Sequence, residues 1–284
     1  MVPRMQSTTR IRLAVMALLL AAGPALAQDA EEVPPELRME EAPPALRVEV
    51  PNRDPFHEKL ALIANPLLPE LEAQALFDEV VASGSLAVPA LVATYRDARS
   101  DDQANWIAAR ALGRIGGASA IRTLSAGLES PRIITRLGAV SGLSLIGDKD
   151  TVPALEKALF DRAMTVRASS ADALALIGSR KSSVALSKAL NLPANYHHGR
   201  SHFVRMHIIE ALGNIGSIGG IDALIGVLGE HEEFLQIAAS VALEKITGVS
   251  FRPLGTDPMA PPSASEVAQW QAWWSQRSVG DISD

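Results

Sequence analysis

The chain contains no cysteine among its 284 residues. This absence excludes disulfide bonds, thiolate metal sites, cysteine nucleophiles and a lipid-anchor cysteine. Aromatic residues make up only 4% of the sequence and charged residues 20%. Hydrophobic residues nevertheless make up 48%, which is enough to bury a sizeable core and excludes disorder over the whole chain. The alanine- and leucine-rich composition favours packed helices over a β-sandwich.

Common catalytic motifs are also missing. The sequence has no Gly-x-Ser-x-Gly elbow, no phosphate loop ending in Gly-Lys-Ser/Thr and no His-Glu-x-x-His zinc helix. Its formal net charge of −6 disfavours binding to nucleic acid, which requires positive surfaces. We therefore expect a protein without catalytic activity, cofactor or nucleic-acid partner.

Residues 1–27 have the parts of a secretory signal peptide. Arginines precede the apolar run Leu13–Ala22, and the small-x-small triplet Ala25–Ala27 follows it. The run is shorter than the roughly 20 residues that a membrane span needs. We therefore expect cleavage after Ala27 and an exported chain, periplasmic or secreted, without a membrane span. A retained signal anchor is the alternative.

Residues 28–54 combine closely spaced glutamates with two Pro-Pro pairs. Like charges and prolines both oppose collapse, so we expect an acidic, proline-rich, disordered linker. Such a linker would hold the folded part away from a surface or partner. A solvated leader without a role is the alternative.

The rest of the sequence repeats itself. Segments of the form Ala-Leu-Gly-x-Ile-Gly, or close variants, surround Leu112, Leu143, Leu174, Leu212 and Leu243. These leucines are 31, 31, 38 and 31 residues apart, a constant step with one seven-residue insertion. A fixed period of this length indicates a repeat architecture.

Each unit contains two helices. Mostly apolar residues lie eight, four and one residues before each repeated leucine and three residues after it, which is the stripe of an amphipathic helix. A glycine follows, as helix ends favour, and a second apolar helix comes next. Thr151-Val152-Pro153 shows the expected start of a second helix, with Thr151 as its cap.

Stacked hairpins hide the apolar faces that a single hairpin exposes. The repeats therefore predict an all-α fold, a right-handed α-solenoid of about five hairpins whose second helices form a curved surface. We expect N-terminal capping helices at residues 55–85 and the repeat array at residues 86–250. A loop and a tryptophan-rich capping helix follow at residues 251–284.

Val166-Arg167 and Val204-Arg205 precede the repeated segment in two units. With these pairs the pattern resembles the HEAT-repeat family, specifically the short bacterial class of phycobilin-lyase-type, armadillo-like repeats. The resemblance covers about residues 86–248 and implies the fold. It leaves the function open, because unrelated proteins use these repeats.

The C-terminal segment is similar to terminal segments of some bacterial HEAT proteins. Ser263–Ser275 fits a helix that begins at Ser263 or Ser265 and places its tryptophans on one side. End repeats expose an apolar side that must be covered. We interpret this helix as a lid on the last repeat; a tryptophan-based partner site is the alternative.

Arg136, Arg167 and Arg205 all lie seven residues before their leucine, so stacking aligns them in a row. Guanidinium groups in a row could grip acidic peptides, and we assign them to partner binding. The alternative follows from the resemblance, because in HEAT proteins this arginine usually ties neighbouring hairpins together. The expected local partners are then Asp148, Asp161 and Asp172.

The seven-residue insertion is the second candidate partner site, since insertions in repeat proteins often lie on a binding face. The residues assigned to it are Asn195, Tyr196, His197, His198 and Arg200. A neutral insertion is the alternative, because surface loops tolerate added length.

Histidines in and after the insertion suggest a metal site as a further alternative. His207 and Glu210 are neighbours on one helix turn, and they could ligate zinc together with His198 or His202. The spacings match no closed zinc pattern, and we assign no metal.

Some HEAT-type enzymes, the deoxyhypusine hydroxylases, bind iron through several His-Glu pairs. This chain has His57-Glu58 and His231-Glu232 alone, too few ligands for such a site. The sequence therefore predicts a non-enzymatic protein–protein interaction or scaffold module of the bacterial cell envelope, with an unknown protein partner on the curved surface. The alternative is a metal-binding protein or metal-dependent enzyme that uses residues 197–210.

Overall fold

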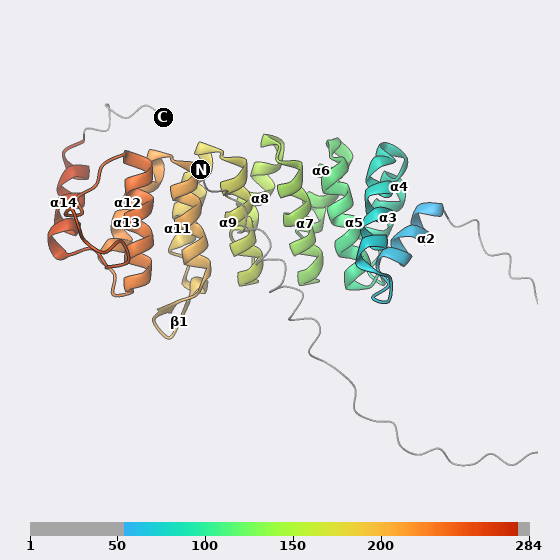
Figure 1. Ribbon diagram of the computed structural model, residues 1–284, viewed down its shortest axis with the longest axis horizontal. Helices are drawn as coiled ribbons and strands as arrows, with labels where there is room; N and C mark the ends of the chain where they lie inside the picture. Colours follow the sequence, from blue (N-terminus) through green and yellow to red (C-terminus); the bar gives the residue numbers. More distant parts are fainter. Residues whose placement is uncertain (1–53, 278–284) are drawn as a thin grey trace, which may run out of the picture. The chain divides into compact units, whose positions relative to one another are not determined.

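A computed structural model describes residues 54–277. The expected signal peptide, the expected linker except for its last residue, and residues 278–284 lie outside the described residues. Within the described part, helices dominate, and each of the two strands is two residues long. The predicted all-α fold is therefore confirmed (Figure 1).

Two sets of helices alternate along the chain. The helices that contain the repeated leucines, called the leucine helices below, are α5 (Asp102–Ile115), α7 (Ile133–Ile146), α9 (Met164–Ile177), α11 (Val204–Ile215) and α13 (Glu233–Thr247). The intervening helices are α4 (Val88–Arg96), α6 (Gly117–Gly127), α8 (Val152–Ala158), α10 (Ser183–Leu190) and α12 (Ile221–Leu228). Each intervening helix packs on the leucine helix that follows it.

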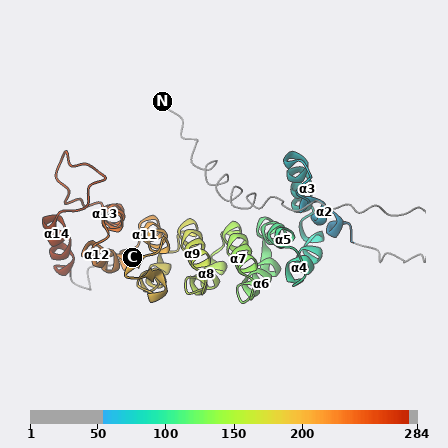
Figure 2. The same ribbon diagram turned by 90° about the horizontal axis from the view of Figure 1, so that it is seen from below.

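Consecutive leucine helices stack side by side in one row, and the intervening helices form a second row (Figure 2). All five repeated leucines are at most 1% exposed. Buried alanines lie beside them and let the helices approach closely. The buried residues form one core that runs from Leu60 to Trp270. This is how stacked hairpins cover apolar faces that each would expose alone.

A glycine in the left-handed conformation ends α7, α9, α11 and α13. Gly142 has a different role, because it lies where α5 and α7 meet. A Cβ atom at this position would lie 2.7 Å from the Ala109 carbonyl oxygen and 2.8 Å from Leu124 Cδ1. The lack of a side chain at Gly142 therefore sets the close approach of these two helices.

Short 3₁₀ helices complete several connections. They are η1 (Gly84–Leu86), η2 (Lys149–Thr151), η3 (Arg180–Ser182), η4 (Pro193–Asn195) and η5 (Ile218–Gly220). The prediction that Thr151 caps α8 with its side chain was wrong. Its hydroxyl donates to the Asp148 carbonyl at 2.7 Å, because the preceding residues form η2. Pro153 still occupies the first turn of α8, where its missing N–H does no harm.

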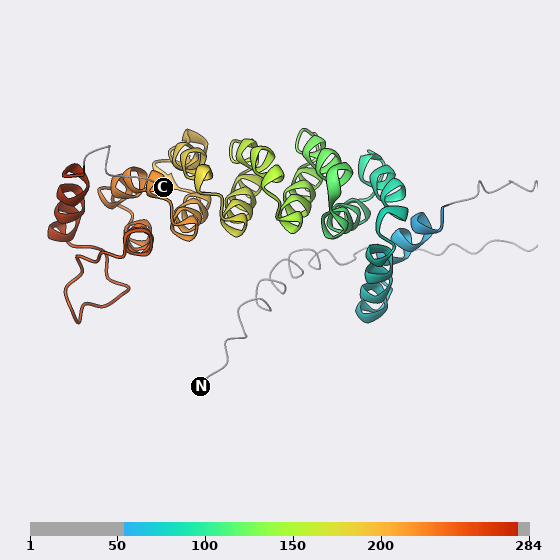
Figure 3. The same cartoon turned by 90° about the horizontal axis from the view of Figure 1, so that it is seen from above.

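Further helices lie at both ends of the array. Helices α2 (Pro55–Ile63) and α3 (Glu70–Ala82) contact α5, and α14 (Ala264–Ser275) contacts α12. Helix α3 and the segment between α13 and α14 both project on the side of the leucine helices (Figures 2 and 3). None of the helices between residues 54 and 277 has the length and apolar character that crossing a membrane requires.

Helix α14 begins with a capping box formed by Ser263 and Glu266. Trp270 on this helix is 1% exposed, and its ring meets the Phe251 ring edge to face at 4.8 Å. Burial of Trp270 against the end of the array agrees with the lid interpretation, since end repeats need an apolar cover.

Candidate functional site

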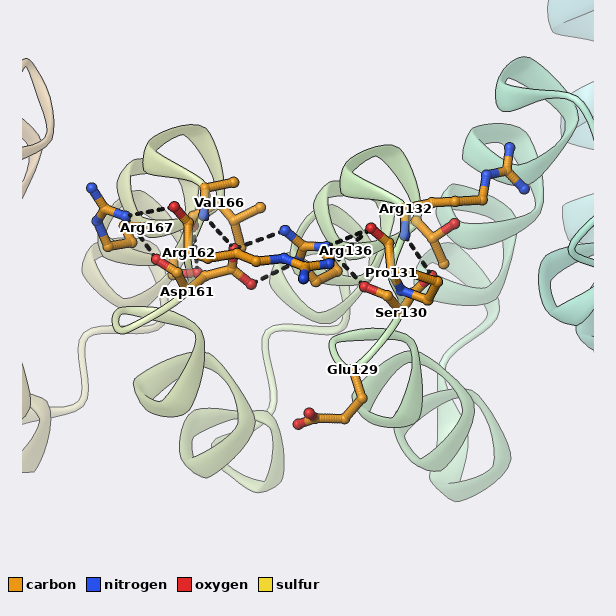
Figure 4. Close-up of polar contacts among 12 residues, drawn as sticks. Glu129, Ser130, Pro131, Arg132, Arg136, Asp161, Arg162, Val166 and Arg167 are labelled. Atoms are coloured by element: carbon orange, nitrogen blue, oxygen red, sulfur yellow. Dashed lines mark hydrogen bonds and ion pairs between the residues drawn. The ribbon is translucent and has the colours of Figure 1, made fainter. Parts of the chain in front are cut away.

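Two of the aligned arginines, Arg136 and Arg167, lie beside the loops that join an intervening helix to the next leucine helix (Figure 4). Arg136 donates from Nε and Nη2 to the two carboxylate oxygens of Asp161 at 2.8 and 3.0 Å. Its Nη1 donates to the Ser130 and Pro131 carbonyls at 2.8 and 3.2 Å. The guanidinium therefore joins the loop before α7 to the loop before α9, one repeat further along.

Arg205 makes the same kind of connection. Its two terminal nitrogens donate to the two oxygens of Glu230, both at 2.6 Å, and Nη1 also donates to Ser201 Oγ at 2.7 Å. The guanidinium lies 4.7 Å from the centre of the Tyr196 ring, within the range of a cation–π contact. Arg205 thus ties the insertion to the loop before α13.

Arg167 meets a neutral partner instead of a carboxylate. Its Nε donates to Asn195 Oδ1 and its Nη2 to the Ala194 carbonyl, both at 2.8 Å. Its Nη1 donates to the Asp161 carbonyl at 2.7 Å. Burial lowers the pKa of Arg167 below its ordinary value, while the charge of Asp161 opposes this effect. Neutral oxygens therefore replace water around this buried charge.

Arg136, Arg167 and Arg205 are only 2%, 2% and 0% exposed. Their assignment to partner binding was therefore wrong, because loop carbonyls and side chains of the next repeat enclose all three guanidinium groups. The structure shows the alternative, a ladder of contacts that ties neighbouring repeats together. Of the expected partners, Asp161 belongs to this ladder, whereas Asp172 bonds to His207.

Amides take the place of arginine in the first and last leucine helices. Asn105 Nδ2 donates to the Tyr95 carbonyl at 2.8 Å. Gln236 Nε2 donates to the Leu228 and Glu230 carbonyls at 3.0 and 2.6 Å. The side chain seven residues before the leucine therefore binds the end of the preceding helix or the connection that follows it in all five units.

The insertion forms a small hairpin of β1 (Tyr196–His197) and β2 (Arg200–Ser201), which pair antiparallel. Ser201 donates from its backbone N and its Oγ to Glu232 Oε1 at 2.9 and 2.7 Å. At the other side, Asn195 Nδ2 donates to the Ala189 carbonyl at 2.8 Å. Both flanking repeats therefore fix the hairpin in place.

The five insertion residues assigned to a partner fall into two groups. Asn195 is completely buried and Tyr196 is half-buried, so both support the hairpin. The assignment of Asn195 to a partner surface was wrong, because its side-chain amide is buried and forms hydrogen bonds with Arg167 and the Ala189 carbonyl. His197, His198 and Arg200 are exposed at the tip and stay candidates for partner contacts.

The residues of the metal alternative do not form one cluster. His198 lies in the hairpin turn with a φ of 48°, and His202 stacks on His197 at 6.0 Å between ring centres. His207 pairs with Asp172 on the neighbouring α9 at 2.8 Å, and Glu210 is exposed. Across residues 54–277, no group of three or more histidine, cysteine or carboxylate side chains could hold a metal ion.

A groove of about 290 Å³ crosses α5, α7 and α9. Its lining includes Trp106, Leu137, Leu145 and Leu176, of which Leu145 is 45% and Leu176 80% exposed. Asp172 is the one charged residue in the lining. The groove lies on the leucine helices, whereas the repeat pattern predicted a curved recognition surface on the second helices.

Helix α7 exposes an apolar face without charge. Its one charged residue is Arg136, which is buried, while Ile133 is 51% exposed. Surface helices normally carry charged residues on the solvent side. The repeat pattern does not reveal this face, because the pattern consists of residues that recur in every repeat. The lack of exposed charge between residues 133 and 146 was the signal that could have revealed it.

Asp172 and His207 join α9 to α11 at the edge of the groove. The hydrogen bond with Asp172 raises the pKa of His207 above its ordinary value of 6.5. Burial opposes this shift, and the charges of Asp172 and Glu210 add to it. The hydrogen bond also orients the carboxylate of Asp172, whose side chain is 50% exposed.

Residues 121–197 match the family model for HEAT repeats. Similar solved structures include an engineered protein, with 22% identity over 68% of this chain and 89% of that chain and a TM-score of 0.43. The complex of CpcE and CpcF of phycocyanin lyase from Nostoc sp. PCC7120 has 20% identity over 78% and 82% of the two chains and a TM-score of 0.39. Human deoxyhypusine hydroxylase in complex with glycerol has 15% identity over 69% and 96%, with a TM-score of 0.34. No curated protein matches the chain significantly.

Proposed function

Because residues 121–197 match the family model for HEAT repeats, we propose that this chain is a non-enzymatic scaffold that binds a protein partner on the exposed face of α7 and α9. The groove over these helices carries the proposal. Contiguous exposed apolar surface on a soluble protein marks interaction sites. The stacked repeats also preform this face, so a partner can dock at little cost in ordering.

The proposed test replaces the two exposed leucines of the groove together, as Leu145→Arg with Leu176→Arg. Partner capture from extracts of the producing cells should be lost, because two buried charges at the interface cannot be solvated. Val184→Arg is the matched control, since Val184 is 55% exposed and lies on α10 in the other row. Capture of the same proteins in equal amounts by both variants would refute the proposal.

The same capture experiment can also test whether the exposed tip of the hairpin contacts the partner. Joint replacement of His197, His198 and Arg200 by serine keeps the buried anchors of the hairpin. Deletion of residues 195–201 would instead remove the partner of Arg167 and is a poor test. If the tip contacts the partner, capture should weaken while the melting temperature stays unchanged.

Export to the bacterial cell envelope is the second part of the proposal. It is supported by the basic start, short apolar run and small-x-small end of residues 1–27. N-terminal sequencing of the protein from fractionated cells should give Gln28 as the first residue. A cytoplasmic chain that retains residues 1–27 would contradict it.

A further inference from the structure

We propose that the groove takes a partner segment in which an apolar side chain lies next to a lysine or arginine, with Asp172 as the residue that selects the positive charge. This inference rests on the proposed function and names the chemistry of the segment that binds. It follows from the placement of one carboxylate in a groove whose other lining residues are uncharged.

An apolar contact and a negative charge adjoin on α9. Asp172 and Leu176 are four residues apart on this helix, so their side chains are neighbours on one face, and both line the groove. An occupant that buries an apolar group against Leu176 therefore brings its neighbouring side chain to Asp172. Burial of the groove strengthens any ion pair made there, because the effective dielectric falls.

The distribution of carboxylates along the leucine helices gives the bound segment a direction. Asp172 lies two residues before the repeated leucine of its helix. The equivalent residues of the other leucine helices are Arg110 on α5, Ser141 on α7, Glu210 on α11 and Val241 on α13. Among the five leucine helices, this position holds a carboxylate on α9 and α11 alone. A basic side chain is therefore attracted to the end of the groove between α9 and α11.

Asp172 is also held in place for this role. Its Oδ1 is 2.8 Å from His207 Nδ1, and half of its side chain is open to solvent. The histidine restricts the rotation of the carboxylate, so a partner cation loses less entropy in pairing with it. His207 offsets one carboxylate when it is protonated below its raised pKa, and Glu210, one turn along α11 from His207, keeps this edge of the groove negative.

The test is a selection from a random peptide library on the immobilised full chain. Peptides enriched by the native protein should carry a lysine or arginine within about four residues of an apolar anchor. Asp172→Asn should keep the apolar preference, lose the basic one and weaken the best peptide about tenfold, the effect of about 1.4 kcal/mol. Asp222→Asn is the matched control, because Asp222 is exposed on α12 in the other row.

Enrichment of acidic residues, or of no apolar anchor, would overturn the inference. So would an equal loss of affinity in Asp172→Asn and Asp222→Asn. If the library yields nothing while partner capture still depends on Leu145 and Leu176, the inference fails and the proposed function stands. If capture is also insensitive to both leucines, the proposed function fails as well.

Discussion

At the scale of single residues, buried guanidinium groups connect each repeat to the next. Arg136 is 2% exposed, and its partner side chain on Asp161 is 10% exposed. Removing one member of such a pair leaves the other charge buried without compensation. The arginine side chains therefore act on stability and not on recognition.

We expect Arg136→Met to lower the free energy of unfolding by about 3–5 kcal/mol, the usual cost of breaking a buried pair. Arg162→Met is the matched control. Arg162 is exposed and donates one hydrogen bond, to the Pro131 carbonyl, so its loss should cost about 1 kcal/mol or less. Denaturant titration measures both, and equal costs would contradict the ladder.

The pair of His207 and Asp172 predicts a dependence on pH. Because the pKa of His207 is raised in the folded chain, the pair stabilises the fold fully below the unfolded pKa of 6.5. This contribution disappears as the pH rises through the raised value. Its size is modest, since half-exposed pairs contribute about 0.2–1 kcal/mol.

Stability should therefore differ more between the native chain and Asp172→Asn at about pH 5.5 than at about pH 8.5. Denaturant midpoints at both values measure the difference, and an NMR titration of His207 gives its pKa directly. A larger difference at the alkaline value would show that the sign of the linkage is wrong.

The sequence predicted the alignment of the arginines but not their role. A fixed period places Arg136, Arg167 and Arg205 in register whatever they contact. Whether each guanidinium reaches a partner or the next repeat depends on Asp161, Asn195 and Glu230, which lie 25–28 residues further along. These three residues play the same role with different side chains, so no residue type repeated in the sequence reveals them.

At the scale of helices, the repeated glycines predicted helix ends well because left-handed backbone favours glycine. Gly142 shows what such a pattern leaves out. It lies inside α7, where a glycine normally costs stability, and its role depends on the distance to Ala109 on another helix.

Gly142→Ala should destabilise the chain, because the added methyl would overlap the Ala109 carbonyl and Leu124. Overpacking of this kind costs about 1–3 kcal/mol. Gly226→Ala is the control, since a Cβ atom at this position on α12 meets nothing within 4 Å. It should stabilise the chain by up to about 1 kcal/mol through helix propensity. Thermal unfolding measures both, and a shift in the same direction would contradict the close approach of α5 and α7.

At the scale of the whole array, each repeat contacts mainly its neighbours, so damage at one end should stay local. Trp270→Ala should therefore loosen α12 and α13 more than α5 and α7, with a loss of about 3–5 kcal/mol at the C-terminal end. Hydrogen exchange resolved by peptide measures this gradient. Equal loss of protection from α4 to α13 would contradict a one-dimensional array.

The sequence predicted the all-α repeat array but not the groove over α5, α7 and α9. Period, helix stripes and glycine positions are local features, and they define how hairpins stack. The groove depends instead on which side chains neighbouring helices leave uncovered. Leu145 and Leu176 look like ordinary core leucines until the structure places them on the outer side of α7 and α9.

Site-specific photo-crosslinking in cells that express the full chain tests the central claim most directly. A photoreactive amino acid at position 145 or 176 should give covalent adducts with a partner protein. The same amino acid at position 184, exposed on the other row of helices, should give none. Adducts from position 184 alone, or equal adducts from all three positions, would show that the face of α7 and α9 is not where this protein binds.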